Sequence, residues 1–191
     1  MKKISIILLI LSVNFMFAQQ IFPLNTPKID RPNHAYYKDL DGELNQYIGT
    51  WKGNWNGKTI YLELKKIKYL YEGADPYYKD KILGERKIIA SNGTVEIDRI
   101  TNFDYQHSEI WGMGIPTGVN GHNYPSLMFY PKNMCDMFAR LVITNITQNQ
   151  MTLHLEGMMG HQKENCIHDA YIHQHGEYPI NFPKDIVLTK Q

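Results

Sequence analysis

Histidine and cysteine residues gather near the C-terminal end of the sequence, where they could bind a metal ion. His161, Cys166, His168, His173 and His175 fall within one short stretch. In an extended chain, His173 and His175 share one strand face, where paired imidazoles are candidate ligands for zinc or copper. The common short zinc spacings are absent, so the alternative is a set of ordinary polar histidines.

A second group of residues could form the mouth of a ligand-binding site. The stretch 106–125 contains four glycines together with Trp111, Tyr124, His107 and His122. Glycine allows movement in a loop, while aromatic rings and imidazoles supply contact area and polar contacts. We therefore expect these four side chains to bind a ligand. The alternative is an ordinary long loop between strands.

Sequence signals for catalysis are weak. The chain has no Gly-x-Ser-x-Gly motif, no His-Glu-x-x-His motif and no pattern for a free cysteine nucleophile. We name no catalytic residue and no cofactor, and a binding protein is favoured over an enzyme. A metal-dependent hydrolase that uses the C-terminal histidines is the least favoured function.

Composition and charge narrow the class of protein. The 191 residues are 43% hydrophobic and 20% charged, which is typical of one folded globular domain. Lys plus Arg is 20 and Asp plus Glu is 19. This near balance argues against a nucleic-acid partner and against polybasic attachment to a membrane.

The first 18 residues resemble a secretory signal peptide. Two lysines follow Met1, a short apolar stretch comes next, and Ala18 provides a small residue at the cleavage point. The alternative is a buried N-terminal strand or helix. No later apolar run is long enough to cross a bilayer. We expect an exported protein, periplasmic or secreted, with no membrane span after cleavage.

Export also bears on the two cysteines. Cys135 and Cys166 are the only pair in the chain, and exported proteins meet oxidising conditions. We expect them to form a disulfide, with two separate buried thiols as the alternative. Spacing alone cannot bring the two side chains within bonding range.

Strand patterns dominate the rest of the chain. Residues 19–46 are predicted to be an extended lead-in, with one short helix over 39–47 at its end. Asn-Gly pairs at 56–57 and 92–93 predict two hairpins. Strands are expected at 48–55, 58–64, 84–90, 94–100, 109–111, 127–130, 138–146, 151–156, 170–173 and 186–188.

No long stretch keeps a helical period, so an antiparallel all-β fold is favoured. We predict one up-and-down barrel of about 8–10 strands with one short N-terminal helix. The domain organisation is a signal peptide over 1–18, a lead-in over 19–46 and a barrel over 47–191.

The start of the first long strand resembles a known family motif. Gly49-Thr50-Trp51 is similar to the Gly-x-Trp opening of the calycin superfamily, which includes lipocalins and avidins. The resemblance implies a lipocalin-like barrel in which Trp51 plugs one end while the other end opens to a ligand. Two features depart from lipocalins. Asn56-Gly57 predicts a tight turn as in avidins, and the last strand offers Lys184 and Lys190 where lipocalins pack an Arg over the Trp.

The mature chain also resembles a family of small, uncharacterised exported proteins of flavobacterial type. The stretches 47–51, 80–85 and 183–189 carry this resemblance. That family has no established activity, so the resemblance implies a fold and gives no mechanism.

The function that these patterns favour is binding of a small, partly apolar ligand inside the barrel. Alternation predicts an apolar inner wall, made by Ile60, Leu62, Leu64, Leu153 and Leu155. The competing hypothesis is a structural or protein-interaction β domain whose interior is filled by its own side chains. The two hypotheses differ in whether a cavity lies beside Trp51, and neither identifies a protein partner.

Overall fold

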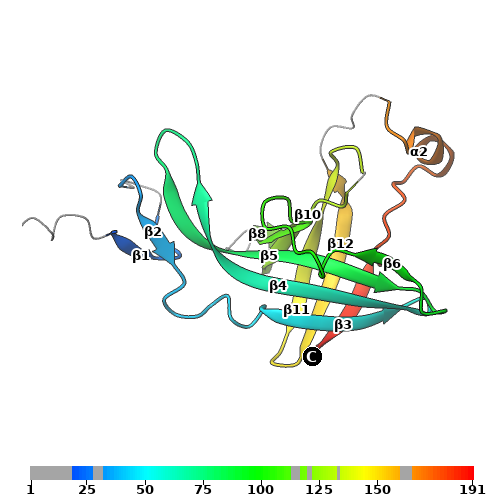
Figure 1. The fold of residues 1–191 in the computed structure, drawn as a ribbon, viewed down its shortest axis with the longest axis horizontal. Helices are drawn as coiled ribbons and strands as arrows, with labels where there is room; N and C mark the ends of the chain where they lie inside the picture. Colours follow the sequence, from blue (N-terminus) through cyan, green and yellow to red (C-terminus); the bar gives the residue numbers. More distant parts are fainter. Residues whose placement is uncertain (1–18, 28–31, 113–116, 120–121, 133, 160–164) are drawn as a thin grey trace, which may run out of the picture.

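Eight antiparallel strands close into a barrel in the computed structural model (Figure 1), which describes residues 19–27, 32–112, 117–119, 122–132, 134–159 and 165–191. The strand order around the barrel is β5-β4-β3-β13-β12-β11-β10-β7, and β7 pairs back onto β5. Their bounds are β3 Gly49–Trp55, β4 Lys58–Tyr71, β5 Tyr77–Ile89, β7 Ile110–Gly112, β10 Ser126–Phe129, β11 Phe138–Ile146, β12 Gln150–Met159 and β13 Asp185–Lys190. The predicted single all-β barrel is confirmed.

The remaining elements are short. They are β1 Ile21–Pro23, β2 Tyr36–Lys38, β6 Val95–Asp98, β8 Thr117–Val119, β9 His122–Tyr124 and α2 Asp169–His175. Strands β8 and β9 pair with each other and form a separate two-stranded sheet. No helix in the described part of the chain is both long enough and apolar enough to cross a bilayer.

The position predicted for the short helix was wrong. Residues 43–47 form successive turns, and the described helix lies at α2, where a strand over 170–173 was expected. The Asp39 carboxylate accepts hydrogen bonds from the backbone N–H groups of Glu43 at 2.7 Å and Leu44 at 3.2 Å. These bonds satisfy the turn locally. Helix α2 buries none of its side chains, so no sheet face holds that segment as a strand.

The two Asn-Gly pairs form different turns. Asn56 and Gly57 both have positive φ, 48° and 76°, as the predicted two-residue hairpin between β3 and β4 requires. In the second pair only Gly93 has positive φ, 84°. The Asn92 side chain accepts a hydrogen bond from the Thr94 N–H at 3.0 Å, and this local turn lengthens the connection between β5 and β6.

Strands β4 and β5 extend well beyond the barrel as one long hairpin (Figure 1). They stay paired from Thr59 opposite Ile89 out to Tyr71 opposite Tyr77. Strand β2 pairs in parallel with the outer part of β5, and β1 pairs in parallel with β2. Strands β1 and β2 of the lead-in segment are therefore part of the sheet.

One edge of β5 pairs with three different strands along its length, so only a short part of β5 pairs with β7 where the barrel closes. We call this β5–β7 pairing the seam. The edge pairs with β2 near Tyr78, with β7 at Leu83 and Gly84, and with β6 from Lys87 onward. Only two residue pairs join β5 to β7.

Buried ion pairs lie beside this seam. Arg86 Nε is 2.8 Å from Glu109 Oε2, and Arg99 Nε is 2.8 Å from Glu85 Oε2. Arg86 Nη1 also donates to the carbonyl oxygen of Asn181, in the segment that leads into β13. Both carboxylates are at most 2% exposed. Burial raises the pKa of Glu85, although Arg99 acts in the opposite direction.

The barrel interior is packed with apolar side chains. Trp51, Ile60, Leu62 and Leu153 are all 0% exposed. A Cβ atom added at Gly53 would lie 2.7 Å from Leu188 Cδ2, so not even a methyl group fits there. The residues expected to wall a cavity therefore belong to one packed core cluster instead.

Candidate ligand pocket on the outer wall of the barrel

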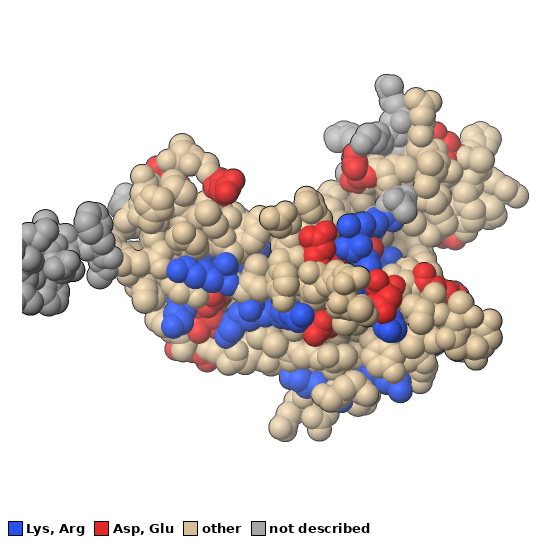
Figure 2. All heavy atoms as spheres, viewed as in Figure 1, with Lys and Arg blue, Asp and Glu red and all other residues tan. Residues whose placement is uncertain are grey.

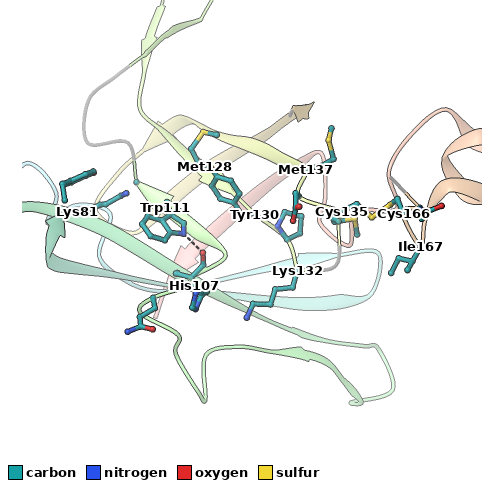
Figure 3. Close-up of a pocket in the computed structure, with 18 residues that line it drawn as sticks. Lys81, His107, Trp111, Met128, Tyr130, Lys132, Cys135, Met137, Cys166 and Ile167 are labelled. Atoms are coloured by element: carbon teal, nitrogen blue, oxygen red, sulfur yellow. Dashed lines mark hydrogen bonds between the residues drawn. A yellow bond between two sulfur atoms is a disulfide. The ribbon is translucent and has the colours of Figure 1, made fainter. Parts of the chain in front are cut away.

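A pocket of about 930 Å³ lies on the outer face of the barrel wall. Strands β5, β7 and β10 form one side of it, and residues 130–132 and 134–137 with 165–167 form the other. In Figure 3 the labelled side chains run from Lys81 and Trp111 at one end to the Cys135–Cys166 disulfide and Ile167 at the other. A volume of this size is typical of small-molecule sites.

Trp111 forms an apolar surface at one end of this pocket. It lies on β7 opposite Leu83 and Met128, and its indole N–H donates to the Ser108 carbonyl oxygen at 2.5 Å (Figure 3). Ser108 is itself anchored, because its hydroxyl donates to the Gly84 carbonyl oxygen of β5 at 2.6 Å. These two bonds fix the orientation of the indole ring.

Three aromatic rings surround the ammonium group of Lys81. Its Nζ lies 4.1 Å from the ring centroid of Trp111, 4.8 Å from Tyr69 and 5.4 Å from Tyr71. Tyr69 meets Trp111 edge to face at 5.4 Å, and it meets Tyr71 in the same way at 5.0 Å. The pairing of β4 with β5 explains this cluster, because residues at alternate positions of both strands share the outer face.

Lys81 also has an unusual electrostatic environment. Burial, and to a lesser extent repulsion from Lys79, lowers the pKa of Lys81 to about 8. Four other lysines of β4 and β5 have carboxylate partners: Lys58, Lys65, Lys66 and Lys87. Within the described residues, no carboxylate oxygen lies within 4.0 Å of Lys81 Nζ.

The disulfide predicted between Cys135 and Cys166 is confirmed, with a Cα–Cα distance of 5.6 Å. It ties residues 165–167 against the loop before β11 and so completes the far wall of the pocket. Helix α2 follows and stands apart from the barrel (Figure 1). A disulfide is consistent with an extracellular or periplasmic location.

Charge on the visible surface is mixed. Figure 2 shows Lys and Arg side chains along the band formed by β4 and β5, interspersed with Asp and Glu. This face therefore carries no field of a single sign, in agreement with the near-balanced composition.

The four predicted ligand-binding residues separate into two groups. Trp111 and His107 both line the pocket, and the side chain of His107 is 75% exposed. His122 and Tyr124 lie on β9, where the backbone pairs with β8, and their side chains are outside the described residues. Within the stretch 106–125, β7 lies in the barrel wall and β8 and β9 form a separate sheet, whereas the whole stretch was expected to form the mouth of the site.

The predicted metal ligands do not share a strand face. His173 and His175 lie on α2, where positions two apart point in nearly opposite directions. His175 Nδ1 is 2.9 Å from the Tyr171 carbonyl oxygen, and His161 lies outside the described residues. Among the side chains that are described, no three His, Cys, Asp or Glu residues form a group that could hold a metal ion.

Gly49 and Trp51 lie on β3, away from the pocket lining. Trp51 is fully buried, and its indole N–H donates to the Tyr47 carbonyl oxygen at 2.8 Å. It therefore acts in the core and not in the pocket.

Lys81 and Tyr71 line the pocket but were not predicted from the sequence as site residues. A signal was present, because Tyr77, Lys79 and Lys81 occupy alternate positions and Tyr69 and Tyr71 do the same. Without the register between the two strands, nothing in the sequence placed them on one face beside Trp111.

Comparison with protein-family models identifies the family. A family of unknown function, DUF6705, matches residues 1–191, so the chain belongs to that family. No curated protein and no solved structure gives a significant match. The closed eight-stranded barrel is consistent with a calycin-like fold.

Proposed function

We propose that this member of a family of unknown function is a non-catalytic binding protein for a small molecule with both apolar and polar parts. The outer-wall pocket is the binding site, and the packed barrel is the scaffold. The observation that carries the proposal is the juxtaposition of Trp111 and Lys81, 4.1 Å apart, in the wall of a 930 Å³ pocket.

The chemistry of the lining supports a ligand of mixed polarity. Trp111, Met128 and Tyr130 offer apolar area, while Lys81 and His107 offer polar contacts. Ligand sites commonly combine an apolar wall with a few convergent polar groups. The aromatic rings lose little side-chain entropy on binding because Trp111 is already held by its hydrogen bond.

The packed interior supports placing the site outside the barrel. A ligand inside would have to displace side chains such as Leu62 and Leu153, which are fully buried. Opening such a core costs several kcal/mol, whereas the outer pocket already exists.

Binding of a hydrophobic fluorescent probe tests the proposal. We expect saturable binding to the wild type and at least tenfold weaker binding to Trp111→Ala, with the fold retained. Trp55→Ala is a matched control. Trp55 is half-buried and has a lysine near its ring, with Lys58 Nζ 5.5 Å from the ring centroid, but it does not line the pocket. Equal affinity of the wild type and Trp111→Ala would exclude this pocket as the site.

Export forms part of the proposal. The disulfide and the signal-like first 18 residues support a periplasmic or secreted protein. The test is expression of the full chain in a Gram-negative host, followed by N-terminal sequencing of the processed form. We expect it to begin at Gln19. An unprocessed chain in the cytoplasm would contradict export.

A second candidate function is a structural or protein-interaction β domain, which the filled interior favours. This function predicts no saturable binding of the probe to the wild type. The same titration therefore separates the two candidates.

A further inference from the structure

We infer that the ligand of the outer-wall pocket is an amphipathic anion whose acidic group pairs with Lys81. This inference rests on the proposed function and names the ligand class of that site. A molecule of this class has an apolar body and one carboxylate or similar group.

Lys81 lacks a counter-charge among the described residues. The ammonium groups of Lys66 and Lys87 lie 3.1 Å and 2.7 Å from carboxylate oxygens. Lys81 is likewise partly buried, but within the described residues its ammonium group contacts three aromatic rings and no carboxylate, and Lys79 adds a repulsive charge. Burying a cation without a counter-charge is costly, and an anion entering the pocket would remove that cost.

The rings around Lys81 hold its ammonium group in position. Cation–π contacts with Trp111, Tyr69 and Tyr71 hold Nζ in place but supply no negative charge. The rings also limit the rotamers that Lys81 can adopt. An acidic group would therefore meet an ammonium group already positioned beside the apolar face of Trp111, where the body of the ligand can lie.

The charges and ring contacts of the lining disfavour a cationic ligand. Lys81 already occupies the ring faces that would bind a ligand cation, so such a ligand would have to displace it. Besides Lys81, the described lining residues include two basic groups, Lys132 and His107, and one carboxylate, Asp136. Lys132 Nζ lies 3.6 Å from Asp104, which leaves Lys81 as the lysine of the lining that needs a partner.

The inference has a pH signature. Because the pKa of Lys81 is lowered to about 8, the ammonium form is lost as the pH rises above 8. Affinity for an anion should fall over that range, and binding near pH 8 should take up a proton. The other titratable groups around Lys81 are Lys79 on its own strand, Tyr69 and Tyr71 on β4, and His107, Lys132 and Asp136 in the pocket lining.

The experiment compares three probes with the same ten-carbon chain: decanoate, decanol and decyltrimethylammonium. Each is used below its micelle concentration to displace a neutral fluorescent probe, N-phenyl-1-naphthylamine, at pH 7. We expect decanoate to bind at least about tenfold more tightly than decanol, as a charge-assisted hydrogen bond implies. Lys81→Met should abolish this preference, so that decanoate binds this variant no more tightly than decanol does.

Two further variants sharpen the result. Lys65→Met removes the same charge from a lysine whose Nζ lies 4.2 Å from the Phe103 ring, outside the pocket, so it should keep the preference. Lys81→Arg should also keep the preference, and it should keep it above pH 8, because guanidinium stays charged. His107→Gln shows whether the pH dependence of decanoate binding persists without His107.

The outcomes distinguish the inference from the proposed function. Equal affinity for decanoate and decanol in the wild type would overturn the anion inference while the binding function stands. Tighter binding of decyltrimethylammonium would overturn it in favour of a cationic ligand. If the neutral fluorescent probe itself does not bind to the wild type, both the anion inference and the binding function are overturned. If the neutral probe binds but none of the three ten-carbon compounds displaces it, the anion inference is overturned.

Discussion

Lys190 Nζ lies 5.2 Å from the ring centroid of Trp51, and the two residues face each other across the pairing of β13 with β3. Gly49 makes this approach possible. Its φ is 129°, and a Cβ atom there would lie only 3.0 Å from Lys190 Cε. Of the two lysines noted near the last strand, Lys190 is thus the one that lies over the tryptophan ring.

Replacing Trp51 should strongly destabilise the fold. The side chain is fully buried, so Trp51→Ala leaves a large cavity, and we expect the free energy of unfolding to fall by about 3–5 kcal/mol. Urea denaturation measures the change. Trp111→Ala, at a half-buried position on the outer wall, is the comparison and should cost clearly less. A loss for Trp51→Ala no larger than that for a surface substitution would remove its role as a core plug.

The seam of the barrel should depend on its buried ion pairs. Arg86→Met leaves Glu109 buried without its 2.8 Å partner, and we expect a loss of about 3–5 kcal/mol in the free energy of unfolding. The double variant Arg86→Met with Glu109→Gln removes both charges. Its loss, measured by the same denaturation, should be smaller than the sum of the two single losses. Strict additivity would show that the two side chains are not coupled.

The disulfide should stabilise both the fold and the pocket. It closes a loop between residues 31 apart in sequence, for which chain entropy predicts about 3.7 kcal/mol of stabilisation. Replacing Cys135 and Cys166 together by alanine should lower the unfolding free energy by that order and weaken probe binding, because residues 165–167 lose their anchor. Alkylation of both thiols in the denatured, unreduced protein would contradict the bond.

Local signals in the sequence predicted the barrel well. Alternation placed Ile60, Leu62 and Leu64 on one face, and all three are buried. Asn56-Gly57 predicted the first hairpin because both positions need positive φ. Such features depend on residues that are neighbours in the sequence, so patterns in a single sequence reveal them.

Features that depend on distant pairing were not predictable. The outer parts of β4 and β5 carry Lys and Tyr on both faces, so alternation gave no sign that the hairpin continues to Tyr71 and Tyr77. The pocket depends on the register that brings Trp111 next to Leu83 and on the disulfide across from it. Whether the inward residues meet a ligand or each other is likewise decided by packing, as at Gly53.

The stability of the folded protein should increase with pH between about 8 and 10.5 through Lys81. Folding lowers the pKa of Lys81 from 10.5 to about 8, so in this range the unfolded chain binds more protons than the folded one. The contribution is complete above 10.5 and is lost as the pH falls through 8. After discounting for the solvent exposure of the side chain, we expect a gain of about 1 kcal/mol relative to Lys81→Met.

Urea denaturation of both proteins at pH 7, 8, 9 and 10 measures the difference, in which the other titrating groups cancel. Parallel curves for the two proteins would show that Lys81 keeps its ordinary pKa, and decanoate bound to the wild type should flatten its curve towards that of the variant.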